Sequence, residues 1–219
     1  MLRAFSDIGT AYRRRAILRA RFDIVRSFAA LEESCIPSYA HRNPLVSMVA
    51  WQRLFAVARL WRRYARTGST LDFGAGTGEV CHLIDLDGPY HFVETDETLS
   101  EALLEFVPKA RRVGLENIAG GMFGCIFALD SLEHNEDVAV IIERLISAML
   151  PDGVFIVSGP TENALYRLGR SIAGFQGHYH KTTIHNIETV LVGRLKLLDL
   201  RSVPFGLPLF RVSAWRLEF

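Results

Sequence analysis

The stretch TLDFGAGTGEV, residues 70–80, places three glycines directly after an apolar run that is typical of a buried β-strand. Glycine permits a sharp turn and lets the main chain approach a ligand closely, because no Cβ stands in the way. Free N–H groups at the start of a following helix favour an anionic group at that point. The stretch therefore predicts a strand, a glycine turn and a helix start that approach a nucleotide-like ligand carrying a carboxylate or phosphate.

Strand-like and helix-like runs alternate from residue 69 onward, which is typical of a parallel sheet covered by helices on both faces. We therefore expect an α/β, Rossmann-like, doubly wound sheet of seven strands that is mostly parallel. Only VPFGLP, residues 203–208, separates the last two strands, so they are expected to form a hairpin with one antiparallel edge strand. The expected strands are 69–73, 90–95, 110–114, 123–129, 153–158, 194–202 and 208–218, and the expected helices are 77–85, 98–106, 135–149, 162–173 and 184–193.

The N-terminal part of the chain lacks this alternation. Helices are expected over residues 8–33 and 44–66, the second of them capped by Asn43. We expect residues 1–66 to form a helical lid and residues 67–219 to form the ligand-binding domain.

Composition excludes several classes of protein. The formal net charge of +1 gives no general attraction for nucleic acid. Three cysteines without a CxxC pair argue against a disulfide framework and fit a reducing, cytoplasmic compartment. No apolar run reaches the ~18 residues of a membrane span. Residues 3–26 hold seven arginines, so peripheral contact with an anionic membrane surface is left open.

In three later stretches, a predicted strand is also followed by polar residues. FVETDETL, residues 92–99, places Asp96 at a strand end, where a carboxylate can accept hydrogen bonds from both ribose hydroxyls. FGCIFALDSLEH, residues 123–134, is an apolar strand followed by a polar cluster, and LPDGVFIVSGPTE, residues 150–162, repeats that arrangement. The carboxyl ends of parallel strands lie at one edge of the sheet, so these residues are expected to meet there.

With the glycine stretch, these motifs resemble those of class I S-adenosylmethionine-dependent methyltransferases of the small-molecule type. The run Asp72 to Gly78 matches the family's [DE]-x-G-x-G-x-G motif, and residues 123–134 are similar to FDxVxxxxxLEH, although Gly124 replaces the usual Asp. The resemblance covers about residues 68–218. It implies S-adenosyl-L-methionine as the cofactor, with in-line transfer of its methyl group from sulfonium to an O, N or C nucleophile. The cofactor-binding residues that it implies are Asp72, Phe73, Gly74, Ala75, Gly76, Gly78, Asp96, Leu129 and Asp130.

Candidate catalytic bases are histidines, because imidazole titrates near neutral pH. His134 closes the LEH motif, and His178 and His180 lie in the segment GHYHKTTIH. In the resembling family the segment after the fifth strand helps to cover the acceptor. Substrate-binding candidates are Trp51, Glu162, Tyr166 and Tyr179, and no metal site is expected.

The expected acceptor is a small or lipid-like molecule. The DPPY or NPPF loop of nucleic-acid amino methyltransferases and the Pro-Cys pair of the cytosine-C5 class are both missing, which disfavours DNA and RNA. Two alternatives stay open. One is a nicotinamide-dependent oxidoreductase, against which Glu79 argues because it replaces the third small residue of G-x-G-x-x-G. The other is a non-catalytic module that binds S-adenosylmethionine or a nucleotide.

Overall fold

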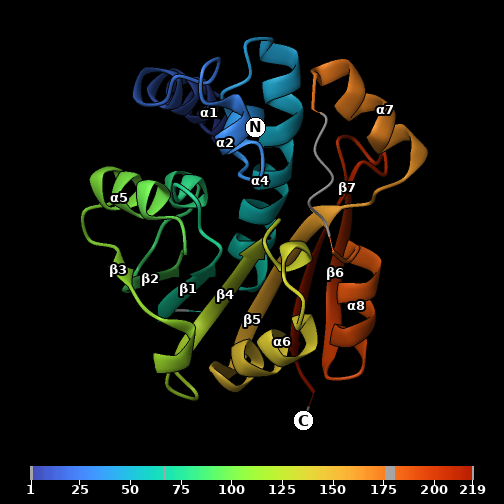
Figure 1. The fold of residues 1–219 in the computed structure, drawn as a ribbon. Coiled ribbons are helices and arrows are strands. Elements are labelled where there is room, and N and C mark those ends of the chain that lie inside the picture. Colours follow the sequence, from blue (N-terminus) through green and yellow to red (C-terminus); the bar gives the residue numbers. More distant parts are fainter. Residues whose placement is uncertain (1, 67, 176–180, 219) are drawn as a thin grey trace.

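A seven-stranded sheet forms the centre of the molecule, with helices on both of its faces (Figure 1). The computed structural model describes residues 2–66, 68–175 and 181–218. The strand order is β3-β2-β1-β4-β5-β7-β6, and the pairs from β3 to β5 are parallel. The expected Rossmann-like, mostly parallel sheet is thereby confirmed. Its strands are β1 (Ser69–Phe73), β2 (Tyr90–Val93), β3 (Arg111–Arg112), β4 (Phe123–Leu129), β5 (Met149–Pro160), β6 (Leu195–Val203) and β7 (Phe210–Leu217).

The antiparallel strand does not lie where the sequence placed it. β7 is antiparallel to both β5 and β6 and lies between them, so the edge strand is β6. The middle of β7 is fully buried, whereas β6 is largely half-exposed or exposed. The more apolar strand therefore takes the inner position, where both of its faces are covered.

Alternation along the inner strands sends neighbouring side chains into two separate cores. Phe127 of β4 packs with α4 (Pro44–Tyr64) on one face. Ile126 packs with α6 (Val138–Ser147) and α8 (Ile184–Val192) on the other face. Both side chains are fully buried, so this strand is apolar on both faces, as parallel strands between two helical layers are.

The helix expected over residues 8–33 is divided. It forms α1 (Leu2–Arg21) and a single turn, α2 (Phe28–Leu31). Between them the Asp23 carboxylate accepts a hydrogen bond from the Arg26 backbone N–H at 3.2 Å. Such local side-chain bonds offer the backbone an alternative to the helix, which explains the break.

The second N-terminal helix is confirmed, but it belongs to the core of the sheet. Asn43 caps α4, since its Oδ1 accepts a hydrogen bond from Leu45 N at 2.9 Å. A short turn, α3 (Ile36–Tyr39), precedes this cap. One continuous apolar cluster contains residues of α1, α4, β4 and β5. The predicted domain boundary between residues 66 and 67 stays a prediction, because residues before and after it pack into the same apolar cluster.

Figure 1 shows α1 and α2 beyond the carboxyl ends of the central strands. Arginines of α1 hold it there. Arg15 donates to the backbone carbonyls of His41 and Arg42, and Arg19 donates to the carbonyl of Ala40. Some of the N-terminal arginines are therefore explained by contacts within the protein rather than by contact with a membrane. Membrane contact stays a prediction. Among the described residues, no helix has the length and apolarity needed to cross a lipid bilayer.

Several elements are shorter than the sequence predicted. The segment 77–85 forms only the 3-10 turn η1 (Glu79–His82), which starts after Gly78 in the left-handed conformation, φ +73°. β3 has two residues, and the run expected as one helix over 135–149 is shortened to α6. The remaining elements are α5 (Glu97–Phe106), η2 (Leu115–Asn117), η3 (Leu132–His134) and α7 (Ala164–Ala173).

Candidate active site

The three glycines after β1 have different roles. A Cβ on Gly74 would lie 2.3 Å from the Cβ of Ser131, so this glycine makes room for the segment after β4. A Cβ on Gly78 would lie 3.0 Å from Leu103 of α5. A Cβ on Gly76 would meet no atom of the described residues within 4 Å, although Gly76 also has positive φ, +54°. Of the three, Gly76 is therefore the one whose bare main chain is open to a ligand.

The glycine turn forms one wall of a cavity of about 380 Å³. The opposite walls come from the ends of β2 and β4 and from residues 31–39 around α3. This is the position beyond the carboxyl ends of the strands where α/β sheets bind ligands. Residues predicted to bind the cofactor that line this cavity are Asp72, Phe73, Gly74, Ala75, Gly76, Asp96, Leu129 and Asp130, whereas Gly78 packs behind it.

Asp72 is a buried carboxylate at this cavity, with 2% of its surface exposed. Its Oδ2 accepts a hydrogen bond from the Tyr90 hydroxyl at 2.7 Å, while its Oδ1 is buried and finds no hydrogen-bond partner in residues 2–66, 68–175 and 181–218. Burial raises the pKa of Asp72 to about 7, against the opposing effect of the Tyr90 hydrogen bond. A buried, unpartnered carboxylate oxygen fits a cationic group such as an ammonium.

Glu94 and Asp96 both follow β2, but they use their side chains differently. Glu94 Oε2 accepts a hydrogen bond from the Gly76 backbone N–H at 2.8 Å, so this carboxylate reaches into the glycine turn. Asp96 caps α5, where its Oδ1 accepts from Leu99 N at 3.0 Å. The sequence prediction selected Asp96 and not Glu94, and the ribose-binding role of Asp96 stays a prediction. A carboxylate at the strand end, two positions before a helix cap, is a sequence signal that would have indicated Glu94 as well.

Glu79 also lines the first cavity, and it forms a buried ion pair with Arg14 of α1. Arg14 donates to both carboxylate oxygens, at 2.9 and 2.8 Å. Thr77 adds a hydrogen bond to Glu79 at 3.1 Å. The pair connects the glycine turn to an element 65 positions earlier, which no local sequence pattern indicates.

A second cavity, of about 320 Å³, lies between α4, α7 and the end of β5. Its walls are mainly apolar and include Val46, Val49 and Phe175. Tyr166 of α7 also lines it and packs edge-on against Phe210, with ring centroids 5.4 Å apart. The two cavities meet at residues that line both of them, namely Glu33, Ser34, Cys35, Asp130 and His134.

Asp130 at this junction is joined to α4 by a buried ion pair. Arg53 Nε lies 2.7 Å from Asp130 Oδ2, and the two side chains are 4% and 6% exposed. This Nε makes no hydrogen bond, so the contact is an ion pair, and Arg53 Nη2 donates instead to the Tyr39 hydroxyl at 2.9 Å. Asp130 Oδ2 also accepts from Ser158 Oγ at 3.1 Å, whereas Oδ1 is buried and no described residue donates a hydrogen bond to it. The junction thus presents a fixed carboxylate oxygen.

Glu133 of η3 lines the second cavity and is 1% exposed. Both of its carboxylate oxygens are buried and have no hydrogen-bond partner among the described residues. Burial raises the pKa of Glu133 well above its usual value; Asp130 raises it further, and Arg53 lowers it. Glu133 is the middle residue of the LEH motif, yet the sequence prediction selected only His134 from that motif.

A model of the methyltransferase domain family matches residues 50–192, from within α4 to the last residue of α8. The chain belongs to this methyltransferase family. The recognition made from the four strand-end motifs is thereby confirmed at the level of the family, and a nicotinamide-dependent oxidoreductase is no longer supported. A comparison of the methyltransferase with curated proteins finds no match.

Solved structures share the fold of this methyltransferase at low sequence identity. The PH0226 protein from Pyrococcus horikoshii OT3 is 14% identical with a TM-score of 0.66, over 83% of this chain and 96% of that one. The N-methyltransferase NodS from Bradyrhizobium japonicum WM9, in complex with S-adenosyl-L-homocysteine, is 12% identical with a TM-score of 0.66, over 88% and 97%. Magnesium protoporphyrin IX methyltransferase, ChlM, from Synechocystis PCC 6803 with bound S-adenosyl-L-homocysteine is 17% identical with a TM-score of 0.63, over 89% and 97%.

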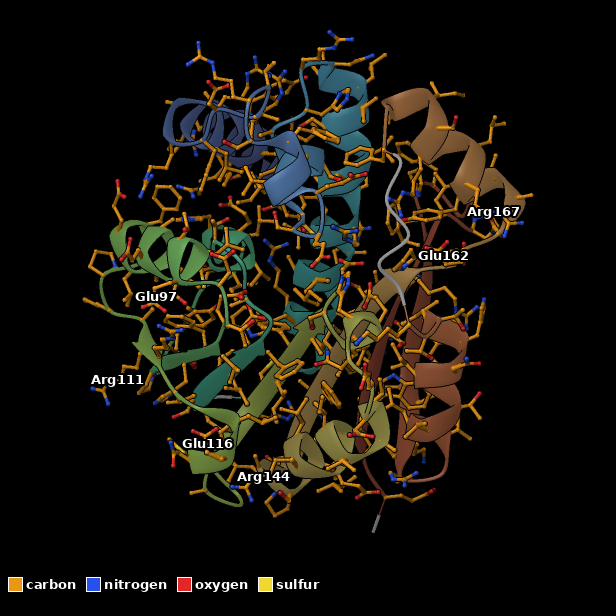
Figure 2. The ribbon with its side chains drawn as sticks, in the orientation of Figure 1. Glu97, Arg111, Glu116, Arg144, Glu162 and Arg167 are labelled. Atoms are coloured by element: carbon orange, nitrogen blue, oxygen red, sulfur yellow. The ribbon has the colours of Figure 1, made fainter. Side chains whose placement is uncertain are left out.

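The other predicted site residues of the methyltransferase are distributed as follows. His134 lies at the junction of the cavities, and Tyr166 lines the second one. Glu162 lies after β5, below α7 (Figure 2). Trp51 lies in the core, since its indole is fully buried, donates to the Tyr39 carbonyl at 3.3 Å and lines neither cavity. His178, Tyr179 and His180 lie outside the described residues.

Proposed function

We propose that this methyltransferase binds S-adenosyl-L-methionine in the first cavity and transfers its methyl group to a small or lipid-like acceptor in the second. The observation that carries the proposal is the meeting of the two cavities at Asp130, His134 and Cys35. A methyl donor on one side and a nucleophile on the other can approach in line at such a junction. Holding two reactants in this way can contribute roughly 7–11 kcal/mol to catalysis.

The residues of the first cavity fit the cofactor. The unpartnered Oδ1 of Asp72 suits the amino group of its methionyl end, and the open main chain of Gly76 allows close approach. We propose that Glu94, which already reaches Gly76 N, binds the ribose hydroxyls. When bound, the cofactor would supply a methyl group on a positively charged sulfur.

The second cavity supports a small or lipid-like acceptor. Its volume of about 320 Å³ lies within the usual range of small-molecule sites, and its walls are mainly apolar. The aromatic side chains of Tyr166, Phe175 and Phe210 offer flat surfaces to an apolar body. One structural neighbour is named as an N-methyltransferase and another as a magnesium protoporphyrin IX methyltransferase, so the fold alone favours no acceptor.

Calorimetry with S-adenosyl-L-methionine and, separately, with NAD tests the binding step. We expect binding of the first compound and none of the second. Release of S-adenosyl-L-homocysteine in the presence of candidate acceptors tests the reaction. Tight cofactor binding without release across small amines, alcohols, carboxylates and lipids would favour a non-catalytic binding module, and absence of cofactor binding would refute the proposal.

A further inference from the structure

The second cavity contains an acidic group whose role the proposed function leaves open. Glu133 lines this cavity, and within the part of the chain that the structure describes both of its buried carboxylate oxygens are without a hydrogen-bond partner. Burying a carboxyl group without a hydrogen-bond partner is costly to the fold, and more so if the group is charged. Such a cost is understandable where a ligand supplies the missing partner.

The charges around the cavity are unbalanced. Among the described residues that line it, four are acidic, namely Glu32, Glu33, Asp130 and Glu133, and two are arginines, Arg53 and Arg170. Each arginine already has an acidic partner, since Arg53 pairs with Asp130 at 2.7 Å and Arg170 lies 3.8 Å from Glu32. The cavity therefore favours a cation: an ammonium ion would stabilise the ionised form of Glu133, which burial otherwise disfavours, whereas a carboxylate-bearing acceptor would not.

The side chains that line the cavity indicate the chemistry of the rest of the ligand. Apart from these charges, the cavity is bounded by aliphatic and aromatic side chains, among them Val46, Val49, Ile172, Phe175 and Phe210. A ligand that satisfies both features has one cationic end and an apolar body. The cationic end must lie near Asp130 and Glu133. Asp130 and His134, the chain neighbour of Glu133, also line the first cavity, so this end lies close to the junction.

We propose that the acceptor is a primary or secondary amine with an apolar body, which enters as an ammonium ion, and that Glu133 removes its proton. This inference rests on the proposed function. Within the site, an N–H bond of the ammonium breaks and the proton goes to a Glu133 oxygen. The freed nitrogen lone pair forms the N–C bond to the methyl group while the C–S bond breaks. The positive charge passes from the sulfonium to the methylated ammonium, and the sulfur leaves as a neutral thioether.

The surroundings of Glu133 suit this proton transfer. Asp130 after β4 and Glu162 after β5 are carboxyl groups near it, and Arg53 of α4 is the opposing cation. Cys35 before α3 is a thiol whose pKa burial raises to about 12, and His134 is the chain neighbour of Glu133. The raised pKa of Glu133 makes it a stronger base than an ordinary glutamate. The arriving ammonium supplies the counter-charge that keeps this carboxylate ionised at the moment of transfer.

The test uses the full chain with three probes of one length: a phenylalkyl amine, the matching alcohol and the matching carboxylate. Calorimetry in the presence of S-adenosyl-L-homocysteine should show the amine binding at least about tenfold more tightly than either of the others. With S-adenosyl-L-methionine, only the amine should release S-adenosyl-L-homocysteine. Equal or tighter binding of the alcohol or the carboxylate would overturn the inference, and this comparison needs no variant.

Glu133→Gln separates the base from the rest of the site. It should lower kcat for the amine by about 10²–10⁴-fold, leave the affinity for S-adenosyl-L-methionine unchanged and flatten the rise of kcat with pH. Glu133→Asp should restore part of the rate. The matched control is Glu136→Gln, which changes an exposed carboxylate of the same segment that pairs with Lys181 at 2.8 Å. An unchanged rate and pH profile in Glu133→Gln would overturn the base role, whereas loss of cofactor binding in the wild type would instead refute the proposed function.

Discussion

Arg14 of α1 and Glu79 of η1 form a buried, bidentate ion pair, with N–O distances of 2.9 and 2.8 Å, that connects the N-terminal helix to the glycine turn. The side chains are 7% and 3% exposed. A pair of this kind holds two elements in one geometry, because separating the partners would leave a charge buried without compensation. The wall of the first cavity is therefore coupled to the position of α1.

Arg14→Ala tests this coupling. We expect a loss of roughly 3–5 kcal/mol in the free energy of unfolding, because Glu79 is left buried and unpaired. Urea unfolding followed by circular dichroism measures it. Arg21→Ala is the matched control on the same helix, since the Arg21–Glu105 pair is exposed and should cost at most about 1 kcal/mol. Equal losses in the two variants would contradict the coupling.

Gly76→Ala tests whether the lack of a side chain at this position is needed for ligand binding or only for the positive φ of the turn. The added Cβ meets no protein atom but occupies the cavity, so we expect at least about tenfold weaker binding of S-adenosyl-L-methionine. The positive φ should also cost about 1–2 kcal/mol of stability. Gly121→Ala supplies the control, because Gly121 has φ +62° and open space around it and does not line either cavity. It should lose similar stability and keep its affinity; similar affinity losses in both variants would argue against ligand contact at Gly76.

Glu94→Ala and Asp96→Ala separate the two carboxylates after β2. Glu94→Ala should weaken cofactor binding by about 10- to 100-fold, the effect of removing hydrogen bonds to a charged group. Asp96→Ala removes the cap of α5 and should cost about 1 kcal/mol of stability. Calorimetry with S-adenosyl-L-methionine, together with thermal unfolding, measures both effects. The opposite order of affinities would instead favour Asp96, as the sequence predicted, as the ribose ligand.

Asp72 predicts a dependence of stability on pH with a defined sign. Its pKa rises from the ordinary 3.8 to about 7 in the folded protein, so between these values the folded state binds more protons than the unfolded state. This group's contribution is therefore present at low pH and is lost as pH rises through about 7. Since one pKa unit is worth about 1.4 kcal/mol, the loss reaches about 4 kcal/mol at most.

Asp72→Asn removes this contribution. The difference in free energy of unfolding between wild type and variant should shift in favour of the variant as pH rises from 4 to 8, as measured by urea unfolding. Above pH 7 the carboxylate is available to an ammonium group, so wild-type affinity for S-adenosyl-L-methionine should increase from pH 5.5 to 7. A flat affinity profile over this range would contradict a contact between Asp72 and the cofactor's amino group.

Local sequence was enough to locate the glycine turn, the strand ends and the cap of α4. Residues 70–80 combine an apolar strand with glycines, and each of those signals lies within a few positions along the chain. The structure places Asp72, Gly76 and Asp130 at one cavity, as the common edge of parallel strands requires. The helix over 77–85 was predicted from the same local signal and was wrong, because η1 ends at His82.

What the sequence by itself determined was the class of the fold, the family and the edge of the sheet that holds the site, since these depend on periodicity and on motifs that are continuous in the chain. Only the tertiary structure decided that β7 lies inside the sheet, that Glu94 rather than Asp96 reaches the glycine turn, and that Arg14 and Arg53 pair with acids at the cavities. It alone revealed Glu133 as a buried carboxyl group without a partner. The physical reason is that burial, pairing and pKa depend on residues far apart in the chain, and their distances are fixed only when the helices pack against the sheet.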